Sequence, residues 1–219
     1  MFVKICGVTS EEDALLAVAL GADAVGFVFA PSRRQVTAER ARDIARRLPP
    51  EVLTVGVFRD EAPQRVVDLV HTAGLRAVQL HGHETPEQAR WVRARVPFLI
   101  QAFPGGDPAL ARAADYGADA VLVDSASPGS GEVWDWSLAE GAPSGHRVIL
   151  AGGLTPGNVA GAVARVRPWG VDVASGVESS PGRKDPVKVR AFVAAARAAE
   201  PPAYRGGDEP PYDWEDETS

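Results

Sequence analysis

The stretch GADAVGF at residues 21–27 recurs as GADAVLV at residues 117–123, and GLRAVQL at residues 74–80 is a looser copy. Each copy places a glycine before a short apolar run, which is typical of a helix end that leads into a buried strand. The two close copies lie half a chain apart. Such repetition favours a closed eightfold (β/α) barrel over an open doubly wound sheet, which remains the alternative.

Short runs rich in valine, isoleucine, leucine and phenylalanine recur along the whole chain. Their continuous rather than alternating apolar character is typical of parallel strands that are buried on both faces. The predicted strands are residues 2–6, 24–29, 52–58, 77–81, 98–103, 120–124, 147–151 and 171–175. Together they predict an α/β protein with a single (β/α)8 TIM barrel over residues 1–199, close to the lower size limit of that fold.

Helix start and stop signals separate these runs. Thr9 with Glu12 and Thr85 with Gln88 match the capping box, in which two side chains satisfy first-turn amides. A capping residue followed by proline predicts helix starts at residues 85–86, 107–108, 155–156 and 185–186. Left-handed helix ends are expected at Gly21, Gly74 and Gly117.

The composition bounds the class of protein. The 219 residues are 45% hydrophobic and 24% charged, which is ordinary for a globular chain. One cysteine excludes an intrachain disulfide, and no apolar run approaches the roughly 20 residues that span a bilayer. With no apolar leader at the start, the sequence predicts a cytoplasmic protein without a membrane segment.

The net charge of −6 is concentrated in residues 200–219, which carry seven acidic residues against Arg205 alone. The remaining chain is balanced, which argues against a nucleic-acid surface because such a surface is basic. The segment 200–219 is rich in proline, glycine and acid. We therefore predict that it is a disordered tail, although its aromatic residues leave room for a docking peptide.

The last two strand–helix turns carry the strongest chemical signal. AGGLTPGNV at 151–159 places Gly152 and Gly153 after a strand, and VASGVESSPG at 173–182 places Ser175 and Gly176 after the next. Phosphate sites are frequent after the seventh and eighth strands of such barrels, where glycines let backbone amides approach the anion. The alternative is that these glycines only form tight turns. We expect a phosphate site.

Cys6 and Asp124 end the first and sixth predicted strands, at the barrel face where active sites lie. A thiolate and a carboxylic acid facing each other could move a proton between carbon and oxygen. The alternatives are a small core residue for Cys6 and a loop cap for Asp124. A free thiol is only a few per cent ionised at neutral pH, so we expect a nearby cation or a helix terminus to lower its pKa, with Lys4 as a candidate cation.

Two further side chains follow predicted strands. In PSRRQV at 31–36, one of the two arginines suits a substrate carboxylate and the other is solvated, and we favour Arg34 over Arg33. His81 is expected to line the pocket as a hydrogen-bonding residue. Together with His83 it makes only a weak metal signal, so we predict no metal and no other cofactor.

These residues resemble a known family. The matching stretches are KICGVTSEEDA (4–14), GADAVGFVF (21–29), AVQLHG (77–82), VLVD (121–124), DWSL (135–138), AGGLTPGNV (151–159) and DVASGVESSPGRKD (172–185). In this order they resemble the phosphoribosylanthranilate isomerases of tryptophan biosynthesis, over residues 2–198. The start and end motifs in combination are highly specific to that family.

The resemblance implies an Amadori rearrangement of N-(5-phosphoribosyl)anthranilate without metal or cofactor. It implies that Asp124 is the general acid and Cys6 the general base. Arg34 would hold the anthranilate group, and Asp172 would assist near the amine. Gly153, Ser175 and Gly176 would bind phosphate through backbone amides. In this chain Glu132 and Val133 replace a lysine and a threonine of many relatives, which removes one cation from that loop.

Rival functions of two classes remain open at this stage. Indole-glycerol-phosphate synthase and the histidine-pathway isomerase are sister phosphate-binding barrels, but the latter favours a carboxylate base where Cys6 stands. A non-catalytic phospho-sugar-binding protein would tolerate loss of the acid–base pair. The expected partner is a small phosphorylated substrate, with no nucleic acid and no membrane, and the protein is expected to be a monomer or homodimer.

Overall fold

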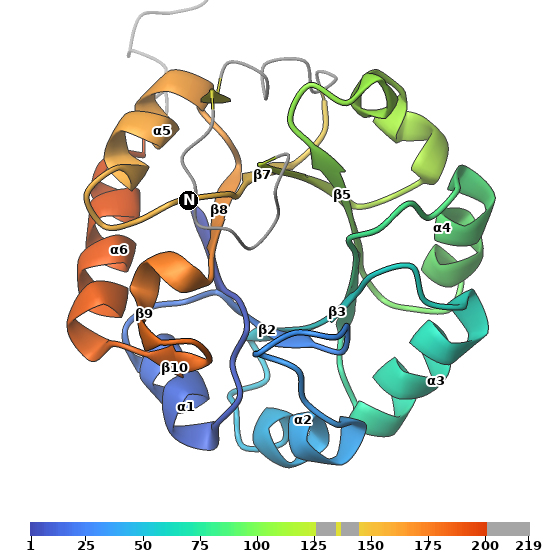
Figure 1. Ribbon diagram of the computed structural model, residues 1–219, viewed down its shortest axis with the longest axis horizontal. Helices are drawn as coiled ribbons and strands as arrows, with labels where there is room; N and C mark the ends of the chain where they lie inside the picture. The colour runs from blue at the N-terminus through green and yellow to red at the C-terminus, as the bar shows by residue number, and fades with distance from the viewer. Residues whose placement is uncertain (126–134, 137–144, 201–219) are drawn as a thin grey trace, which may run out of the picture.

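The computed structural model describes residues 1–125, 135–136 and 145–200 (Figure 1). Eight parallel strands form a closed barrel in chain order, and the last strand pairs with the first. This confirms the predicted (β/α)8 fold and every predicted strand. The strands are β1 (Phe2–Ile5), β2 (Ala24–Val28), β3 (Leu53–Phe58), β4 (Ala77–Leu80), β5 (Leu99–Pro104), β6 (Ala120–Asp124), β7 (Val148–Leu150) and β8 (Gly170–Val173).

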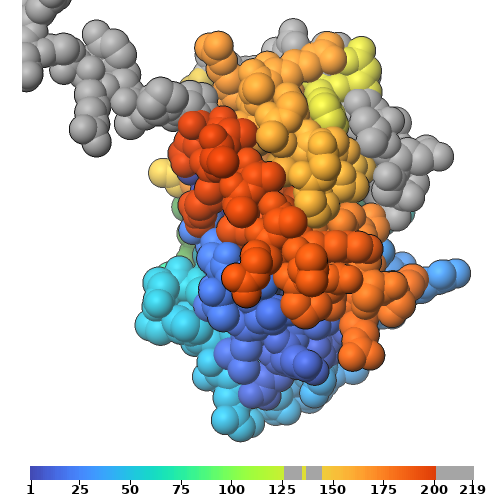
Figure 2. All heavy atoms as spheres, turned by 90° about the vertical axis from the view of Figure 1, so that its left-hand side faces the viewer, coloured from blue at the N-terminus to red at the C-terminus, as the bar shows by residue number. Residues whose placement is uncertain are grey.

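Helices surround the barrel as an outer ring, and Figure 2 shows α6 between α5 and α1 on one side of the molecule. One of these elements, between β5 and β6, is a 3₁₀ helix in place of the expected α-helix. The elements are α1 (Glu11–Ala19), α2 (Ala38–Ala45), α3 (Pro63–Ala73), α4 (Pro86–Arg93), the 3₁₀ helix η1 (Pro108–Tyr116), α5 (Val159–Val166) and α6 (Pro186–Ala198).

Most of the helix signals work as predicted. Thr85 and Gln88 form a capping box, Asp185 caps α6, and Asp107 caps η1. Gly21, Gly74 and Gly117 have positive φ angles next to helix ends. Two predictions are wrong in detail, because neither Thr9 nor Thr155 is the N-cap of the helix that follows it.

The first correction concerns α1, which is capped by Ser10 because the Thr9 hydroxyl instead donates to the carbonyl of Gly182. The second concerns α5, which begins at Val159 and not after Thr155. The segment before it is a turn in which the Asn158 side chain accepts from the amide of Thr155 and donates to the carbonyl of Gly153.

Two apolar layers hold the fold. One fills the barrel interior, and its buried members include Val55, Ile100, Leu122 and Ile149. The other lies between the strands and the helix ring. Toward the carboxyl ends of the strands the interior becomes polar, with buried Lys4, Gln79, Asp124 and Asp172. Because successive strand residues alternate sides, the inward positions above the apolar layer are the ones that can form a site.

A short segment with its own secondary structure lies between β8 and α6. It comprises the 3₁₀ helix η3 (Ser175–Val177) and the two-stranded hairpin of β9 (Glu178–Ser180) and β10 (Arg183–Lys184). The segment ends next to the end of β1, where Lys184 contacts Cys6, before α6 begins. No described helix is long and apolar enough to cross a membrane. The predicted tail beyond Glu200, and the substitutions at Glu132 and Val133, lie outside the described residues.

Candidate active site

A cavity of about 180 Å³ opens at the carboxyl ends of the strands. A smaller hollow of about 60 Å³ adjoins it and shares Asp124 and Asp172 with it. The predicted site residues come from separate elements, and all of them except Gly176 line these two spaces. Cys6, Arg34, His81, Asp124 and Asp172 line the larger one, and Gly152, Gly153 and Ser175 line the smaller one together with the two aspartates.

Cys6 follows β1 directly and is 8% exposed. Its amide donates to the carbonyl of Val173 on β8 (2.8 Å), which fixes the residue at the seam where the barrel closes. Burial raises the pKa of the Cys6 thiol, and the positive charges of Lys4 and Lys184 oppose this rise without reversing it. The expected cation is therefore present, but the prediction of a lowered pKa is wrong because desolvation outweighs the attraction.

Lys4 and Asp172 form a buried ion pair beside the thiol, with 3.0 Å between Nζ and Oδ1. Burial acts to lower the pKa of the Lys4 ammonium, but Asp172 and Cys6 outweigh it and raise the pKa. Gly26 on β2 makes room for this group, since a Cβ there would lie 2.8 Å from the Cys6 sulfur and 3.2 Å from Lys4 Nζ. An ammonium group therefore stays charged next to the candidate base.

Asp124 ends β6 and is 7% exposed. Its Oδ1 accepts from the amide of Ser125 (2.7 Å), and its Oδ2 lies 3.2 Å from Nε2 of His81 in a polar contact outside hydrogen-bond geometry. Nδ1 of His81 is 2.8 Å from the side-chain nitrogen of Gln79. With that amide donating, Nδ1 is the acceptor, so the ring nitrogen that carries the proton is Nε2, the one nearer to Asp124.

Arg34 lies over the residue that follows the thiol. A Cβ at Gly7 would lie 2.4 Å from Cδ of Arg34, so glycine is needed where the arginine stem crosses. The guanidinium donates from Nε and Nη2 to the two oxygens of Glu178, each at 2.8 Å. Arg33 is exposed, so of the two adjacent arginines it is Arg34 that reaches the cavity.

The smaller hollow is shaped by the two glycine-containing turns. Gly152 and Gly153 adopt left-handed φ angles of 81° and 63°, which suit glycine. Gly176 packs against the other turn, since a Cβ there would lie 1.8 Å from the carbonyl oxygen of Leu154. The first amides of η3 have no partner within that short helix. Backbone N–H groups can thus face an anion in this hollow, although Gly176 itself does not line it.

Three residues of the site were not singled out from the sequence: Gln79, Glu178 and Lys184. A glutamine inside the apolar run AVQL was a usable signal, because a buried amide needs polar partners. Glu178 and Lys184 lie in the motif DVASGVESSPGRKD, but nothing in their spacing shows that they turn back to Cys6. Their role depends on the hairpin.

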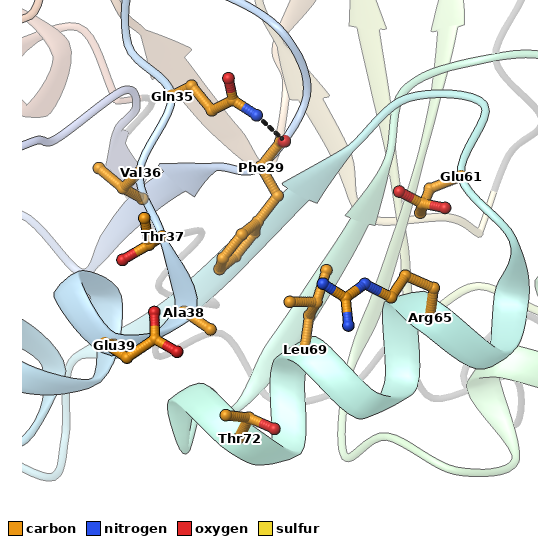
Figure 3. A pocket seen from close by; sticks show the side chains of 10 residues that line it. All are labelled: Phe29, Gln35, Val36, Thr37, Ala38, Glu39, Glu61, Arg65, Leu69 and Thr72. Atoms are coloured by element: carbon orange, nitrogen blue, oxygen red, sulfur yellow. Dashed lines mark hydrogen bonds between the residues drawn. The ribbon is translucent and has the colours of Figure 1, made fainter.

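A wider hollow of about 670 Å³ lies outside the barrel, between α2 and α3 (Figure 3). Arg65 and Leu69 of α3 line it opposite Thr37 and Glu39 at the start of α2. It holds none of the predicted site residues. Within the described ranges, no group of three or more histidine, cysteine, aspartate or glutamate side chains could hold a metal ion.

Comparisons with known proteins find one family. The family model described as N-(5'phosphoribosyl)anthranilate (PRA) isomerase matches residues 3–195. The curated N-(5'-phosphoribosyl)anthranilate isomerase of Desulforudis audaxviator is 52% identical over 204 residues, covering 90% of this chain and 98% of that protein.

Solved structures give the same result. The phosphoribosyl anthranilate isomerase of Thermus thermophilus is 49% identical with a TM-score of 0.85, covering 90% of this chain and 99% of that one. A second isomerase structure, in complex with reduced 1-(o-carboxyphenylamino)-1-deoxyribulose 5-phosphate, is 41% identical with a TM-score of 0.80 and the same coverage. The chain belongs to the N-(5'-phosphoribosyl)anthranilate isomerase family.

Proposed function

We propose that this chain converts N-(5'-phosphoribosyl)anthranilate to 1-(2-carboxyphenylamino)-1-deoxyribulose 5-phosphate, with Cys6 as general base and Asp124 as general acid. The observation that carries the assignment is that these two groups, from β1 and β6, line one cavity at the barrel mouth. That cavity opens beside the hollow lined by Gly152, Gly153 and Ser175, which suits a phosphate at one end of the substrate.

The first step opens the sugar ring. The Asp124 carboxylic acid donates its proton to the ring oxygen as the bond from that oxygen to C1' breaks. The nitrogen lone pair forms a C1'–N double bond, so the product is a protonated imine. The negative charge left on Asp124 is stabilised by the amide of Ser125 and the N–H of His81 that faces it.

The second step moves the proton from carbon. The Cys6 thiolate removes the proton from C2', the electrons form a C1'–C2' double bond, and the imine nitrogen regains its lone pair. The resulting enolamine loses its C2' hydroxyl proton and gains a proton at C1', which gives the ketone. The Lys4 ammonium next to the sulfur stabilises the thiolate, and Asp172 keeps Lys4 charged.

Binding groups hold the two ends of the substrate. We assign the phosphate to the backbone amides of Gly152, Gly153, Ser175 and Gly176, and the anthranilate carboxylate to the Arg34 N–H groups that Glu178 leaves free. Asp172 faces the cavity next to the candidate base and is assigned to the amine side. Fixing both ends places C2' against Cys6 and the ring oxygen against Asp124.

The test is a fluorescence assay that follows the loss of phosphoribosylanthranilate made in situ. Wild-type protein should consume it, and Cys6→Ser or Asp124→Asn should each lower kcat by about 10²–10⁴-fold while KM changes little. Full activity in either variant contradicts the mechanism. Activity of the wild-type chain on the histidine-pathway aldose alone would favour the sister isomerase.

Three further assignments accompany the function. We place the enzyme in the cytoplasm, because its only cysteine serves in the site and its family is biosynthetic. A related isomerase from Thermotoga maritima is described as dimeric, and we assign this chain a monomer or homodimer. Sedimentation velocity separates these states. Residues 1–199 are assigned as the catalytic domain.

A further inference from the structure

Lys184 is a lysine with no exposed side-chain surface, located where the hairpin meets the barrel. Its ammonium donates to the carbonyl of Cys6 (2.6 Å), the carbonyl of Ala174 (3.2 Å) and Oε1 of Glu178 (2.9 Å). All three N–H groups of the ammonium are therefore used. One cation ties the end of β1, which carries the candidate base, to the end of β8, where the phosphate turn begins.

Glu178 extends this contact to a third part of the site. Its carboxylate accepts from Lys184 and from two N–H groups of Arg34. Burial alone raises the pKa of the Glu178 carboxyl, but Arg34 and Lys184 outweigh it and lower the pKa. A carboxylate held this way fixes the plane of the guanidinium and leaves its remaining N–H groups for a ligand.

Stability alone does not explain the arrangement. Burying charges in the interior carries a desolvation penalty, and well-packed apolar residues often stabilise such a position as well or better. Burial lowers the pKa of the Lys184 ammonium, which means that desolvation at this site disfavours the positive charge. Glu178 opposes this effect. The contacts are instead those that would set the relative positions of the base, the phosphate turn and Arg34.

We propose that Lys184 and Glu178 are positioning residues of the isomerase site. Lys184 sets the distance between the Cys6 backbone and the turn that begins at Ala174, and it places a positive charge near the sulfur. Glu178 sets the orientation of Arg34. This inference rests on the proposed roles of Cys6 and Arg34. It assigns Lys184 to the proton-transfer step and Glu178 to substrate binding.

The lone cysteine makes a direct test possible, because the ultraviolet absorbance of a thiolate in this chain reports Cys6 alone. Lys184→Met and Glu178→Gln are compared with wild type, with Cys6→Ser as the blank for tyrosine ionisation. Lys188→Met is the matched control. The Lys188 ammonium donates to the backbone carbonyl of Glu178 (2.7 Å). Lys188 therefore holds the same hairpin but does not contact the three groups that accept from Lys184.

The expected results separate the two roles. Lys184→Met should raise the thiol pKa and lower kcat by about 10²-fold, as expected for a displaced base. Glu178→Gln should raise KM roughly tenfold with a small change in kcat, because Arg34 loses a charge-assisted partner, and it should not raise the thiol pKa. Lys188→Met should leave the thiol titration, kcat and KM near those of wild type.

The charged groups that act on the sulfur come from several elements, so the titration is read against all of them. They are Lys4 on β1, Asp172 on β8, Lys184 on β10 and Arg34 after β2. Only Lys184 is altered in the first variant. An upward shift in a folded protein, judged by circular dichroism, is therefore attributed to that ammonium.

Two results would overturn the inference. One is an unchanged thiol titration in folded Lys184→Met, and the other is an unchanged KM in Glu178→Gln. If Lys184→Met does not fold, the Glu178→Gln result alone decides, since that variant keeps the size of the side chain. The thiol titration needs no substrate. Failure of the proposed function, seen as full activity in Cys6→Ser, is thus a separate outcome.

Discussion

The two sides of the barrel mouth are built differently. On the side of the proposed base, called the base side below, Cys6 lies among ionic groups from β1, β8 and β10, and two ammonium groups act on its sulfur. On the side of the proposed acid, called the acid side below, Asp124 contacts an imidazole and a backbone amide, and the imidazole is held by the amide side chain of Gln79. One side is ionic and the other relies on hydrogen-bonding groups.

The difference fits the roles that we propose for the two groups. A thiol becomes negative when it acts as a base, and in a buried site that charge needs cations. A general acid must keep its proton until the substrate binds. A lysine in contact with the acid would favour the ionised carboxylate and so promote early loss of the proton. Neutral hydrogen-bonding groups also stabilise the carboxylate that forms after proton transfer, but they favour early ionisation less strongly than a full positive charge does. Changes on the base side should therefore have larger effects than changes on the acid side.

The largest effect is expected from breaking the buried pair on the base side. Lys4→Met leaves Asp172 without its partner at a site where the lysine is 0% and the aspartate 7% exposed. An uncompensated buried charge costs about 3–5 kcal/mol, which a urea titration would measure as a lower free energy of unfolding. Adding Asp172→Asn should restore part of the loss. Equal stability of Lys4→Met and wild type would show that the pair contributes nothing.

The titration of the Cys6 thiol gives a pH-dependent prediction for the base side. Burial raises the pKa of the thiol above its ordinary value, so the thiolate fraction of the free enzyme should still be increasing through neutral and mildly alkaline pH. Below the thiol pKa, the ultraviolet absorbance of the thiolate, read against Cys6→Ser, should rise close to tenfold per pH unit. The rate is a poorer measure, because kcat/KM depends on the protonated fraction of Asp124 as well. A thiolate absorbance that is already constant at neutral pH would contradict a raised thiol pKa.

The smallest effect is expected on the acid side. Gln79→Leu removes the hydrogen bond to Nδ1 of His81 at a position that is 1% exposed. Loss of one such bond is worth about 1 kcal/mol, so kcat should fall roughly fivefold with little loss of stability. Gln101→Leu is the matched control, because Gln101 is equally buried on β5 and, among the described residues, its side chain bonds only the carbonyl of Ala102. Equal effects of the two changes would show that His81 needs no orientation by Gln79.

Much of the architecture could be predicted because its signals are local. Eight apolar runs gave the strands, and left-handed glycines such as Gly74 and Gly117 gave helix ends, since each depends on a few neighbouring residues. One error came where a local signal had a distant competitor. Thr9 lost its capping role to a bond with Gly182, which is 173 positions away.

The sequence by itself determined the strand order, the barrel mouth as the place of chemistry, and the residue types that face it. Only the tertiary structure decided the surroundings of Cys6. Asp172 meets Lys4 across 168 positions, and Lys184 meets the Cys6 carbonyl across 178. Barrel closure brings β8 and the hairpin to β1, and burial at that seam raises the thiol pKa while supplying the cations that oppose the rise. Desolvation and long-range charge depend on the closed fold, so no spacing along the chain could set their balance.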